Sequence, residues 1–111
     1  AMNLRDLVDT LELCPVCLAD GAESAAVSAA YCGDLLSDVL AHAPAQSVWF
    51  TIQSHVNIVA VAQLRDVACV VLVNGVAPHP ETVAKARAQR VNVCASAATS
   101  ADLCMRLAGK L

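Results

Sequence analysis

The sequence has 111 residues, of which 58% are apolar, and its seven basic and ten acidic residues give a formal net charge of −3. It has no basic run and only one residue each of Trp, Tyr and Phe, which excludes the stacking platforms and phosphate-tracking patches typical of nucleic-acid-binding proteins. No apolar stretch approaches the roughly 20 residues of a membrane span, so neither nucleic acid nor a membrane is an expected partner.

The first third of the chain predicts a helix, a strand and a second helix. Asn3 can cap the first helix, and Asp20-Gly21 interrupts the segment that follows it. The stretch AAVSAAYC, residues 25–32, predicts a strand that ends at Gly33, and Asp34 is expected to cap the second helix. The apolar faces of the two helices consist of Leu4, Leu7, Val8 and Leu11, and of Leu35, Leu36, Val39 and Leu40.

The rest of the chain alternates strands with helices. Three strands are expected, over residues 47–53 (SVWFTIQ), 68–74 (ACVVLVN) and 91–96 (VNVCAS). Between the first two, residues 55–64 (HVNIVAVAQL) predict a largely buried helix, although their β-branched side chains also suit a strand. Pro80 prepares a surface helix. A final helix, capped by Thr99 or Ser100, contains Leu103, Leu107 and Leu111.

This order of segments predicts the fold class. Strands that alternate with helices through short connections form right-handed crossovers and a mainly parallel sheet with helices packed on it. We therefore expect one domain over residues 1–111, an α/β three-layer sandwich with a sheet of about five strands.

Polar residues follow each predicted strand, and ligands of parallel sheets bind beyond the carboxyl ends of the strands. These residues should therefore meet at one edge of the sheet, which we call the rim. The predicted ligand-binding residues are Gly33, Asp34, Ser37, Gln53, Ser54, His55, Asn57, Asn74 and Gly75, with Asp38 as a further candidate. Free N–H groups of helix N-termini are expected at the same edge, where they favour an anion.

A simpler interpretation of the rim stays open. Asp34, Ser54 and Thr99 could each be an ordinary helix cap. This accounts less well for the group from Gln53 to Asn57, because one cap needs one oxygen. Near a helix N-terminus His55 is expected to be neutral, and it could contact a ligand or lie free on the surface.

No enzyme signature is present. The sequence has no G-x-x-x-x-G-K-[ST], G-x-G-x-x-G, G-x-S-x-G or H-E-x-x-H pattern, and only four glycines with which to build a phosphate-binding loop. We therefore predict no catalytic residues, no cofactor and no metal, and a protein that is not an enzyme.

The N-terminal sequence AMNLRDLVDTLEL lacks the pattern of a signal peptide. Ala1 looks like a remnant of tag removal, and we expect Met2 to be the native start and the location to be cytoplasmic. In that compartment the six cysteines should be reduced thiols. Cys69 and Cys104 lie in apolar patterns and are expected to pack as small hydrophobic residues.

The CPVC sequence suggests a redox or metal role for Cys14 and Cys17. A thioredoxin-like pair needs a strand before it and a helix after it, whereas here a helix comes before. In a strand, residues three apart point to opposite faces, and a zinc site needs four ligands. Cys32 could join Cys14 and Cys17 as an iron–sulfur ligand triple, although the spacing matches no established pattern.

The stretch AYCGDLLSDVLAHAPAQSVWFTIQSHVNIVAVAQLRDVACVVLVNG resembles the DRTGG domain family. The most specific parts are YCGDLLSDV, the pattern W-x-T-I-Q-x-H-x-N-I-V-A-V-A and the turn NG-x-x-P; with PHPETVAKARAQRVNV and the final helix, the resemblance covers nearly the whole chain. Such domains are similar to the N-terminal domain of HPr kinase/phosphorylase. They also occur beside CBS domain pairs and phosphotransacetylase domains and as small stand-alone proteins. The resemblance implies an α/β fold and the sensing or binding of a small ligand.

The chain departs from the family at the signature that names it. The Asp-Arg-Thr-Gly-Gly motif should fall at residues 23–30, which read ESAAVSAA, so Ser28 replaces threonine and Ala29-Ala30 replaces the glycine pair. Serine keeps the hydroxyl, but alanine neither adopts a positive φ freely nor allows as close a backbone approach. Any site formed there is expected to be altered. Without a phosphate-binding loop, the chain is not expected to be a serine kinase domain.

Two functions remain as hypotheses. The first is a non-catalytic regulatory or ligand-sensing module, a homodimer that binds a small anionic metabolite or nucleotide at the rim. The excess of apolar residues motivates the dimer, because a chain of this size cannot bury them all. The second is a protein-interaction or thiol- or metal-linked accessory protein that uses Cys14, Cys17 and Cys32.

Overall fold

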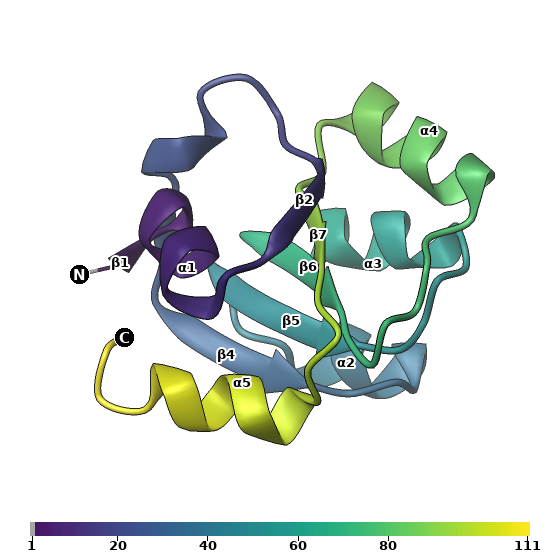
Figure 1. Cartoon of the computed structure of the whole chain (residues 1–111). Coiled ribbons are helices and arrows are strands. Elements are labelled where there is room, and N and C mark those ends of the chain that lie inside the picture. Colours follow the sequence, from purple (N-terminus) through teal and green to yellow (C-terminus); the bar gives the residue numbers. More distant parts are fainter. Residues whose placement is uncertain (1) are drawn as a thin grey trace.

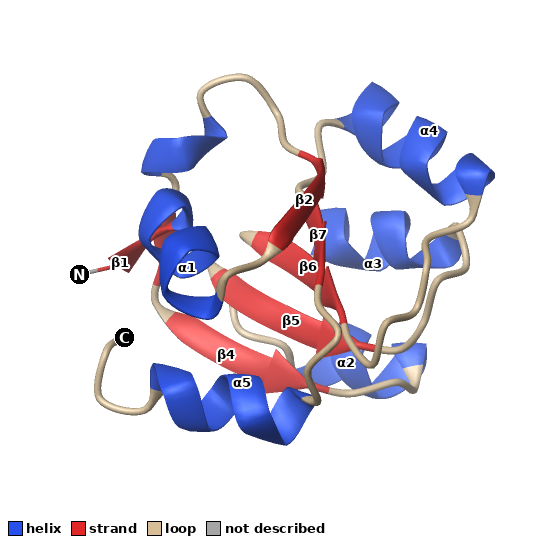
Figure 2. Cartoon of the chain, in the orientation of Figure 1, coloured by secondary structure: helices blue, strands red, loops and turns tan. Residues whose placement is uncertain are grey.

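A five-stranded sheet forms the centre of the computed structural model, which describes residues 2–111 (Figure 1). The strands lie in the order β2–β7–β6–β5–β4 (Figure 2). The strands from β7 to β4 run parallel to one another, whereas β2 pairs antiparallel with β7. Their bounds are β2 Cys14–Cys17, β4 Ala29–Cys32, β5 Ser47–Thr51, β6 Cys69–Leu72 and β7 Val93–Ala95. The predicted α/β architecture with a mainly parallel sheet is therefore confirmed.

Helices cover both faces of this sheet. Their bounds are α1 Leu4–Leu11, α2 Leu36–His42, α3 Asn57–Leu64, α4 Pro80–Gln89 and α5 Ser100–Leu107. Helices α1 and α5 lie on one face, and α2, α3 and α4 on the other (Figure 1). Within residues 2–111, none of these helices is both long and apolar enough to span a bilayer.

Two hydrophobic cores fill the space between the layers, because successive strand residues point to opposite faces. In β5, Val48 and Phe50 pack with the leucines of α1 and α5, whereas Trp49 packs with Val39 of α2 and with residues of α3. All residues of β5 and β6 are buried, as a sheet covered on both faces requires.

Several predicted helix starts are confirmed. Asn3 caps α1 in a reciprocal capping box with Asp6, and the Thr99 hydroxyl accepts a hydrogen bond from the Asp102 N–H at the start of α5. Pro80 occupies the first turn of α4, where its missing N–H costs nothing. These signals lie within a few residues of the helix ends they define.

The strand predicted over residues 25–32 is broken at Ser28. Its first part, β3 (Ala26–Val27), pairs antiparallel with β1 (Met2–Asn3) in a separate two-stranded sheet, and a short 3₁₀ helix, Ala22–Ser24, precedes it. The Ser28 N–H donates to the Gln46 carbonyl as the chain changes partner. Pairing with a distant segment therefore sets this break.

Three further expectations about packing are wrong. Helix α2 starts at Leu36, so Leu35 precedes it and is 69% exposed, and Leu40 is also exposed. Only one side of α3 is buried, since Leu64 is 72% exposed. The last helix ends at Leu107, which leaves Leu111 outside it. Ala1 lies outside the described residues.

Candidate functional site

The carboxyl ends of β4, β5 and β6 point to the same side of the sheet (Figure 2). Cys32 of β4 lies opposite Phe50, and Thr51 of β5 lies opposite Leu72, so these three strands end nearly level. The segments that follow them hold the predicted ligand-binding residues. The structure thus brings these residues to one edge, and the contacts of Asp34, Gln53, Ser54, His55 and Asn57 divide them into three groups.

The first group fastens the loop after β4 to the loop after β5. One carboxylate oxygen of Asp34 accepts hydrogen bonds from the Thr51 hydroxyl (3.0 Å) and from the Ile52 N–H (2.9 Å). The Gln53 side-chain amide donates to the Asp34 carbonyl at 2.9 Å, and the Gln53 N–H donates to the Thr51 hydroxyl. We call Asp34, Thr51 and Gln53 the rim lock.

The rim lock corrects one prediction. Asp34 does not cap α2, because the residue at the cap position is Leu35 and no side chain supplies a cap hydrogen bond there. The carboxylate instead takes two donors from β5 and the loop after it, 17 and 18 residues further along the chain. A charged acceptor strengthens both hydrogen bonds.

Gly33 also joins the loop after β4 to β5, through two hydrogen bonds and close packing. Its carbonyl accepts from the Trp49 indole N–H at 2.9 Å, and its N–H donates to the Phe50 carbonyl. A Cβ added at this glycine would lie 3.2 Å from the Tyr31 ring and 3.3 Å from Val39. Glycine is favoured here because the space is small.

Next to Gly33, the Tyr31 hydroxyl donates to the Asp38 carboxylate. This hydrogen bond, together with burial and the Asp38 charge, raises the pKa of Tyr31 above its usual value. Asp38 also contacts His42 on the next turn of α2. Asp38 therefore has partners within the chain, while Ser37 is exposed on the surface of α2.

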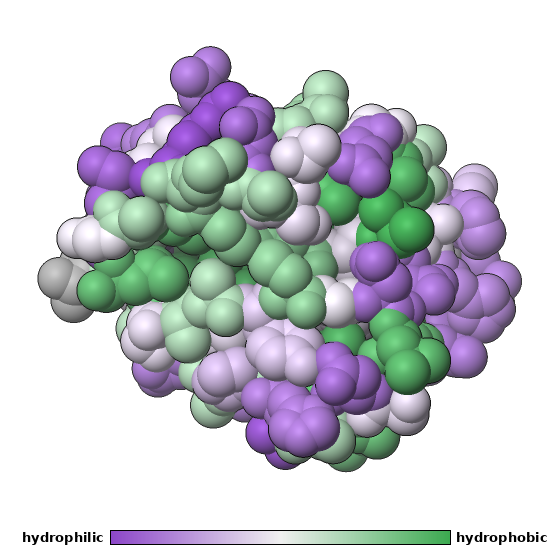
Figure 3. All heavy atoms as spheres, turned by 90° about the horizontal axis from the view of Figure 1, so that it is seen from below, coloured by the Kyte–Doolittle hydropathy of each residue, from purple (hydrophilic) through white to green (hydrophobic). Residues whose placement is uncertain are grey.

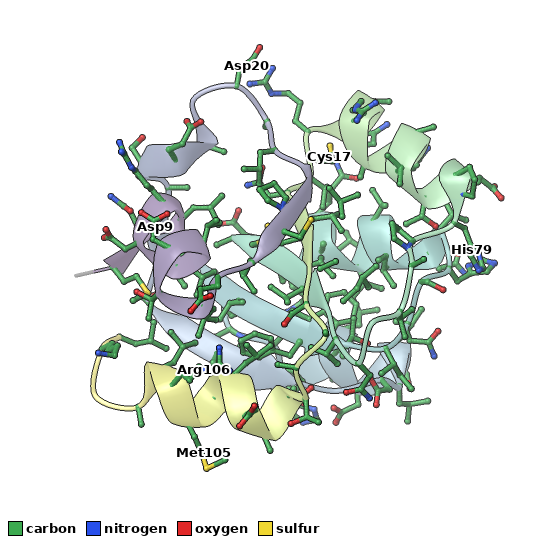
Figure 4. All side chains as sticks on the ribbon, viewed as in Figure 1. Asp9, Cys17, Asp20, His79, Met105 and Arg106 are labelled. Carbon is green, nitrogen blue, oxygen red and sulfur yellow. The ribbon has the colours of Figure 1, made fainter. Side chains whose placement is uncertain are left out.

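The second group joins the loop after β5 to the start of α4. The buried Thr82 hydroxyl donates to the Ser54 carbonyl at 2.6 Å, and the Ser54 hydroxyl lies 3.3 Å from Nε2 of His79. Figure 4 shows His79 at the N-terminal end of α4. Ser54 does not cap α3, whose cap residue is Val56 without a side-chain hydrogen bond. Sequence reasoning did not reveal these two contacts, because they span 25 and 28 residues.

The N-terminus of α3 does not offer the expected free N–H groups. The Asn57 N–H donates to Nδ1 of His55, the Ile58 N–H to the His55 carbonyl and the Val59 N–H to the Val56 carbonyl. These donors are already engaged within the chain. In the neutral imidazole, acceptance at Nδ1 places the proton on Nε2, so the exposed ring can donate to a ligand there.

His55 and Asn57 form the third group, beside a groove between α3 and α4. The groove has a volume of about 530 Å³, within the range of small-molecule sites, and is open to solvent. Its polar lining consists of Asn57, Glu81 and Lys85, and its apolar lining of Val56, Ala60, Ala84 and Ala88. Alanines on both helices keep the floor low, so a ligand can approach closely.

Asn74 and Gly75 lie apart from this groove. Both adopt a left-handed conformation, with φ of 58° and 72°, as Asn and Gly tolerate best. Their N–H groups donate to the carbonyls of Ala98 and Ser96, which fixes the turn against the segment after β7. Gly75 borders a separate hollow of about 330 Å³ that also contacts Cys14.

Residues 28–30, where the resemblance to the DRTGG family departs from its signature, lie at the end of β4 away from the rim. Ser28 precedes β4, and its hydroxyl contacts the Gln46 side chain at 3.3 Å, while Ala29 and Ala30 begin the strand. The rim lies beyond the other end of β4. Ser28, Ala29 and Ala30 therefore take no part in the rim lock or the groove.

Cys14, Cys17 and Cys32 do not come together in the fold. Cys14 is exposed and Cys17 is buried on β2, as expected for a strand (Figure 4 labels Cys17). Cys32 is the last residue of β4, and β4 and β2 are the two outermost strands of the sheet. Four strand spacings of about 4.8 Å therefore separate Cys32 from β2. Residues 2–111 contain no cluster of three or more His, Cys, Asp or Glu side chains that could hold a metal ion. The proposed ligand triple of Cys14, Cys17 and Cys32 is therefore wrong.

Comparisons with known proteins bear on the fold. Neither the models of protein families nor the curated proteins give a match. Among solved structures, the chain is similar to the CBS and DRTGG domains of the regulatory region of Clostridium perfringens pyrophosphatase, complexed with the activator diadenosine tetraphosphate. The TM-score is 0.77 at 12% identity, over 96% of this chain and 46% of that one. The chain thus spans less than half of its neighbour. The fold expected from the DRTGG resemblance is confirmed.

Proposed function

We propose that the chain is a non-catalytic regulatory module that binds a small anionic ligand in the groove between α3 and α4. The observation that carries this proposal is the groove itself, which Lys85 and Asn57 line together with three alanines. Its fold is also that of a regulatory region whose structure contains a nucleotide activator. We propose a cytoplasmic location for such a module.

The hydrogen bonds at the rim support the proposal that the ligand binds in the groove and not at the rim lock. Asp34, Thr51 and Gln53 already bond to one another and to nearby backbone, so a ligand would have to displace those bonds. Asn57 and Lys85 are exposed and line the groove. The rim lock would hold the loop that leads into α3, and the exposed side chains of Asn57 and Lys85 would bind the ligand.

The charges of the groove favour a nucleotide. Glu81 and Lys85 lie one helical turn apart on α4 and both line the groove. A ligand with hydroxyl donors at one end and a phosphate at the other would complement this pair, with the sugar hydroxyls on Glu81 and the phosphate on Lys85. Carboxylates bind ribose hydroxyls in other nucleotide sites. The alanines would contact the sugar or base.

A catalytic role has less support. The Ser54 hydroxyl and His79 lie 3.3 Å apart, as a nucleophile and its base would. Among residues 2–111, however, no carboxylate accepts a hydrogen bond from His79 to orient the ring as such a base. We therefore infer binding rather than chemistry.

A thermal-shift screen tests the proposal. Nucleoside mono-, di- and triphosphates, diadenosine tetraphosphate, sugar phosphates and acyl-CoA compounds would each be added to the full chain. A ligand at 100 times its Kd adds about 2.7 kcal/mol, which raises the Tm by on the order of ten degrees. Lys85→Ala and Asn57→Ala should abolish the shift without lowering the Tm of the free protein.

Lys110→Ala is the matched control, since it removes the same charge near the C-terminus, outside the groove. A shift that survives Lys85→Ala but is lost in His55→Ala would move the site to the rim. The absence of any shift would favour the second hypothesis in its remaining form, a protein-interaction module that binds no metal through Cys14, Cys17 and Cys32.

We further propose that the module is a homodimer. Large apolar side chains remain exposed, and the face seen in Figure 3 carries broad apolar areas between polar ones. Leu35 is 69% and Ile52 44% exposed, and the Asp34 carboxylate, next to Leu35, bonds to the Ile52 N–H. Leu35→Ser with Ile52→Ser should give a monomeric mass by sedimentation equilibrium, whereas Met105→Ser should keep the dimer. A monomeric wild-type mass at micromolar concentrations would disprove this part.

A further inference from the structure

Two cysteines far apart in the sequence meet at the surface beside the rim. Cys32 is the last residue of β4, Cys104 lies in α5, and their Sγ atoms are 3.3 Å apart although 72 residues separate them. Cys32 is exposed and Cys104 is partly exposed. Oxidants in solution can therefore reach this pair.

The core fixes the orientation of α5 that produces this contact. Leu103 and Leu107 are buried among residues of α1 and the sheet. Met105 is 70% exposed and points away from the sheet (Figure 4). Cys104, between Leu103 and Met105, is thereby directed along the surface toward the end of β4. A disulfide bond is about 2.0 Å long, so the sulfurs need to move little more than about 1 Å closer.

The other cysteines lack this combination of proximity and access. Cys69 and Cys94 are neighbours, but they are 1% and 0% exposed within the core. Their hydrogen bond, and after it burial, raises the pKa of Cys69 and keeps it a thiol. Cys17 is buried. Cys14 lies on β2, which is the outermost strand on the other side of the sheet from β4 and Cys32.

We propose that Cys32 and Cys104 are a thiol oxidation site, which a hydroperoxide converts to a disulfide bond and a dithiol reductant restores. In the first step a thiolate of Cys104 attacks one peroxide oxygen; an S–O bond forms, the O–O bond breaks and the leaving hydroxide takes up a proton. In the second step the Cys32 sulfur attacks the Cys104 sulfur, the S–S bond forms, and the S–O bond breaks. The released hydroxide leaves as water with the Cys32 proton. Two thiols and one hydrogen peroxide thus give one disulfide and two water molecules.

The environment of the pair supports this order. Partial burial raises the pKa of Cys32 to about 12, with further contributions from the hydrogen bond to Cys104 and from the charges of Cys104 and Asp34. Cys32 therefore stays a thiol at neutral pH and keeps the proton that it gives up in the second step. Cys32 then acts as the resolving cysteine.

The disulfide would tie α5 to the end of β4, directly before Gly33 and the rim lock. It closes a long loop of the chain, and such cross-links reduce the entropy of the unfolded state. Oxidation should therefore raise the Tm by roughly 10 °C. This inference is independent of whether the groove binds a nucleotide.

The experiment uses the full chain, reduced and then freed of reductant. Hydrogen peroxide at one to five equivalents should lower the intact mass by two hydrogens without producing a covalent dimer, and dithiothreitol should restore the mass. Trypsin leaves Cys94 and Cys104 together in the peptide 91–106, so fragmentation of the cross-linked peptide must place the bond.

Cys32→Ser and Cys104→Ser should each abolish the mass change and the Tm increase, while Cys14→Ser keeps both. The wild-type measurement does not depend on whether a variant folds. A bond that maps to Cys14, Cys17 or Cys94, an intermolecular disulfide, or no loss of mass under these conditions would overturn the proposal.

Discussion

Gln53 at the rim and Asn57 of the groove both follow β5, yet they differ in what they contact. Thr51 and Gln53 bond to Asp34 and hold two loops together. Asn57, four residues after Gln53, presents its side chain to an open groove. A polar stretch after a strand can thus combine structural and binding residues, and only their partners tell them apart.

This difference leads to opposite expectations for substitutions. Substitutions in the rim lock should lower stability and affect ligand affinity only indirectly, because the oxygens and N–H groups of these residues are hydrogen-bonded within the chain. Substitutions in the groove should weaken ligand binding and leave the free energy of unfolding unchanged, because exposed side chains contribute little to folding. The Lys85 and Lys110 variants described above test the second expectation.

Asp34→Ala should have the largest effect on stability. It removes the acceptor of the Thr51 hydroxyl and of the Ile52 N–H, and hydrogen bonds to a charged group contribute more than neutral ones. We expect a loss of about 2 kcal/mol in the free energy of unfolding, or roughly 8 °C in Tm. Calorimetry measures the Tm, and hydrogen exchange at the Ile52 N–H should accelerate.

Asp20→Ala is the matched control, because it removes an exposed carboxylate far from the rim. Asp34→Asn should fall between the two, since the amide keeps one acceptor oxygen. If Asp34→Ala were as stable as Asp20→Ala, the lock would be a surface contact without energetic weight.

Thr82→Val should cost less, about 1 kcal/mol in the free energy of unfolding. Valine fills the same buried space but leaves the Ser54 carbonyl without its 2.6 Å partner. Denaturant titration gives the free energy, and exchange should accelerate at residues 54–57 while the Ile52 N–H stays protected. Thr10→Val on α1 provides a control with the same change of side chain at a less buried position. Equal exchange in both variants would show that this link does not hold the loop.

The sequence predicted those features that depend on neighbouring residues. The caps at Asn3 and Thr99 act on N–H groups three residues away, and the buried strands show as apolar runs. The gathering of polar residues at one edge followed from the parallel sheet alone. Local patterns therefore sufficed for the layers, most of the strands and the position of the rim.

The missed features all depend on contacts between distant segments. Asp34 was predicted to cap the adjacent helix, but its partners lie 17 and 18 residues away. Cys104 packs against the core as predicted, but only the fold places it beside Cys32. The groove arises because α3 and α4 lie side by side, which no single stretch of sequence shows.

The smallest expected effect concerns Tyr31, beside the lock, and appears only at high pH. Its hydrogen bond to Asp38 is the main reason that its pKa lies above the usual value of about 10. The protonated phenol is thus favoured in the folded state, and the stability that this adds is fully present below pH of about 10. It is lost as the pH rises from there through the higher pKa of the folded protein.

Tyr31 is the single tyrosine of the chain, so absorbance of the phenolate reports this group alone. The ionisation midpoint of the folded protein should lie above that of the unfolded protein. Asp38→Asn should lower the midpoint toward the unfolded value, because the amide carries no charge to oppose the phenolate. Ser37→Ala, on the adjacent exposed position of α2, should leave it unchanged. A midpoint equal in the wild type and in Asp38→Asn would mean that the Tyr31–Asp38 bond does not persist in solution, and the packing around Gly33 would then have to hold the end of β4 by itself.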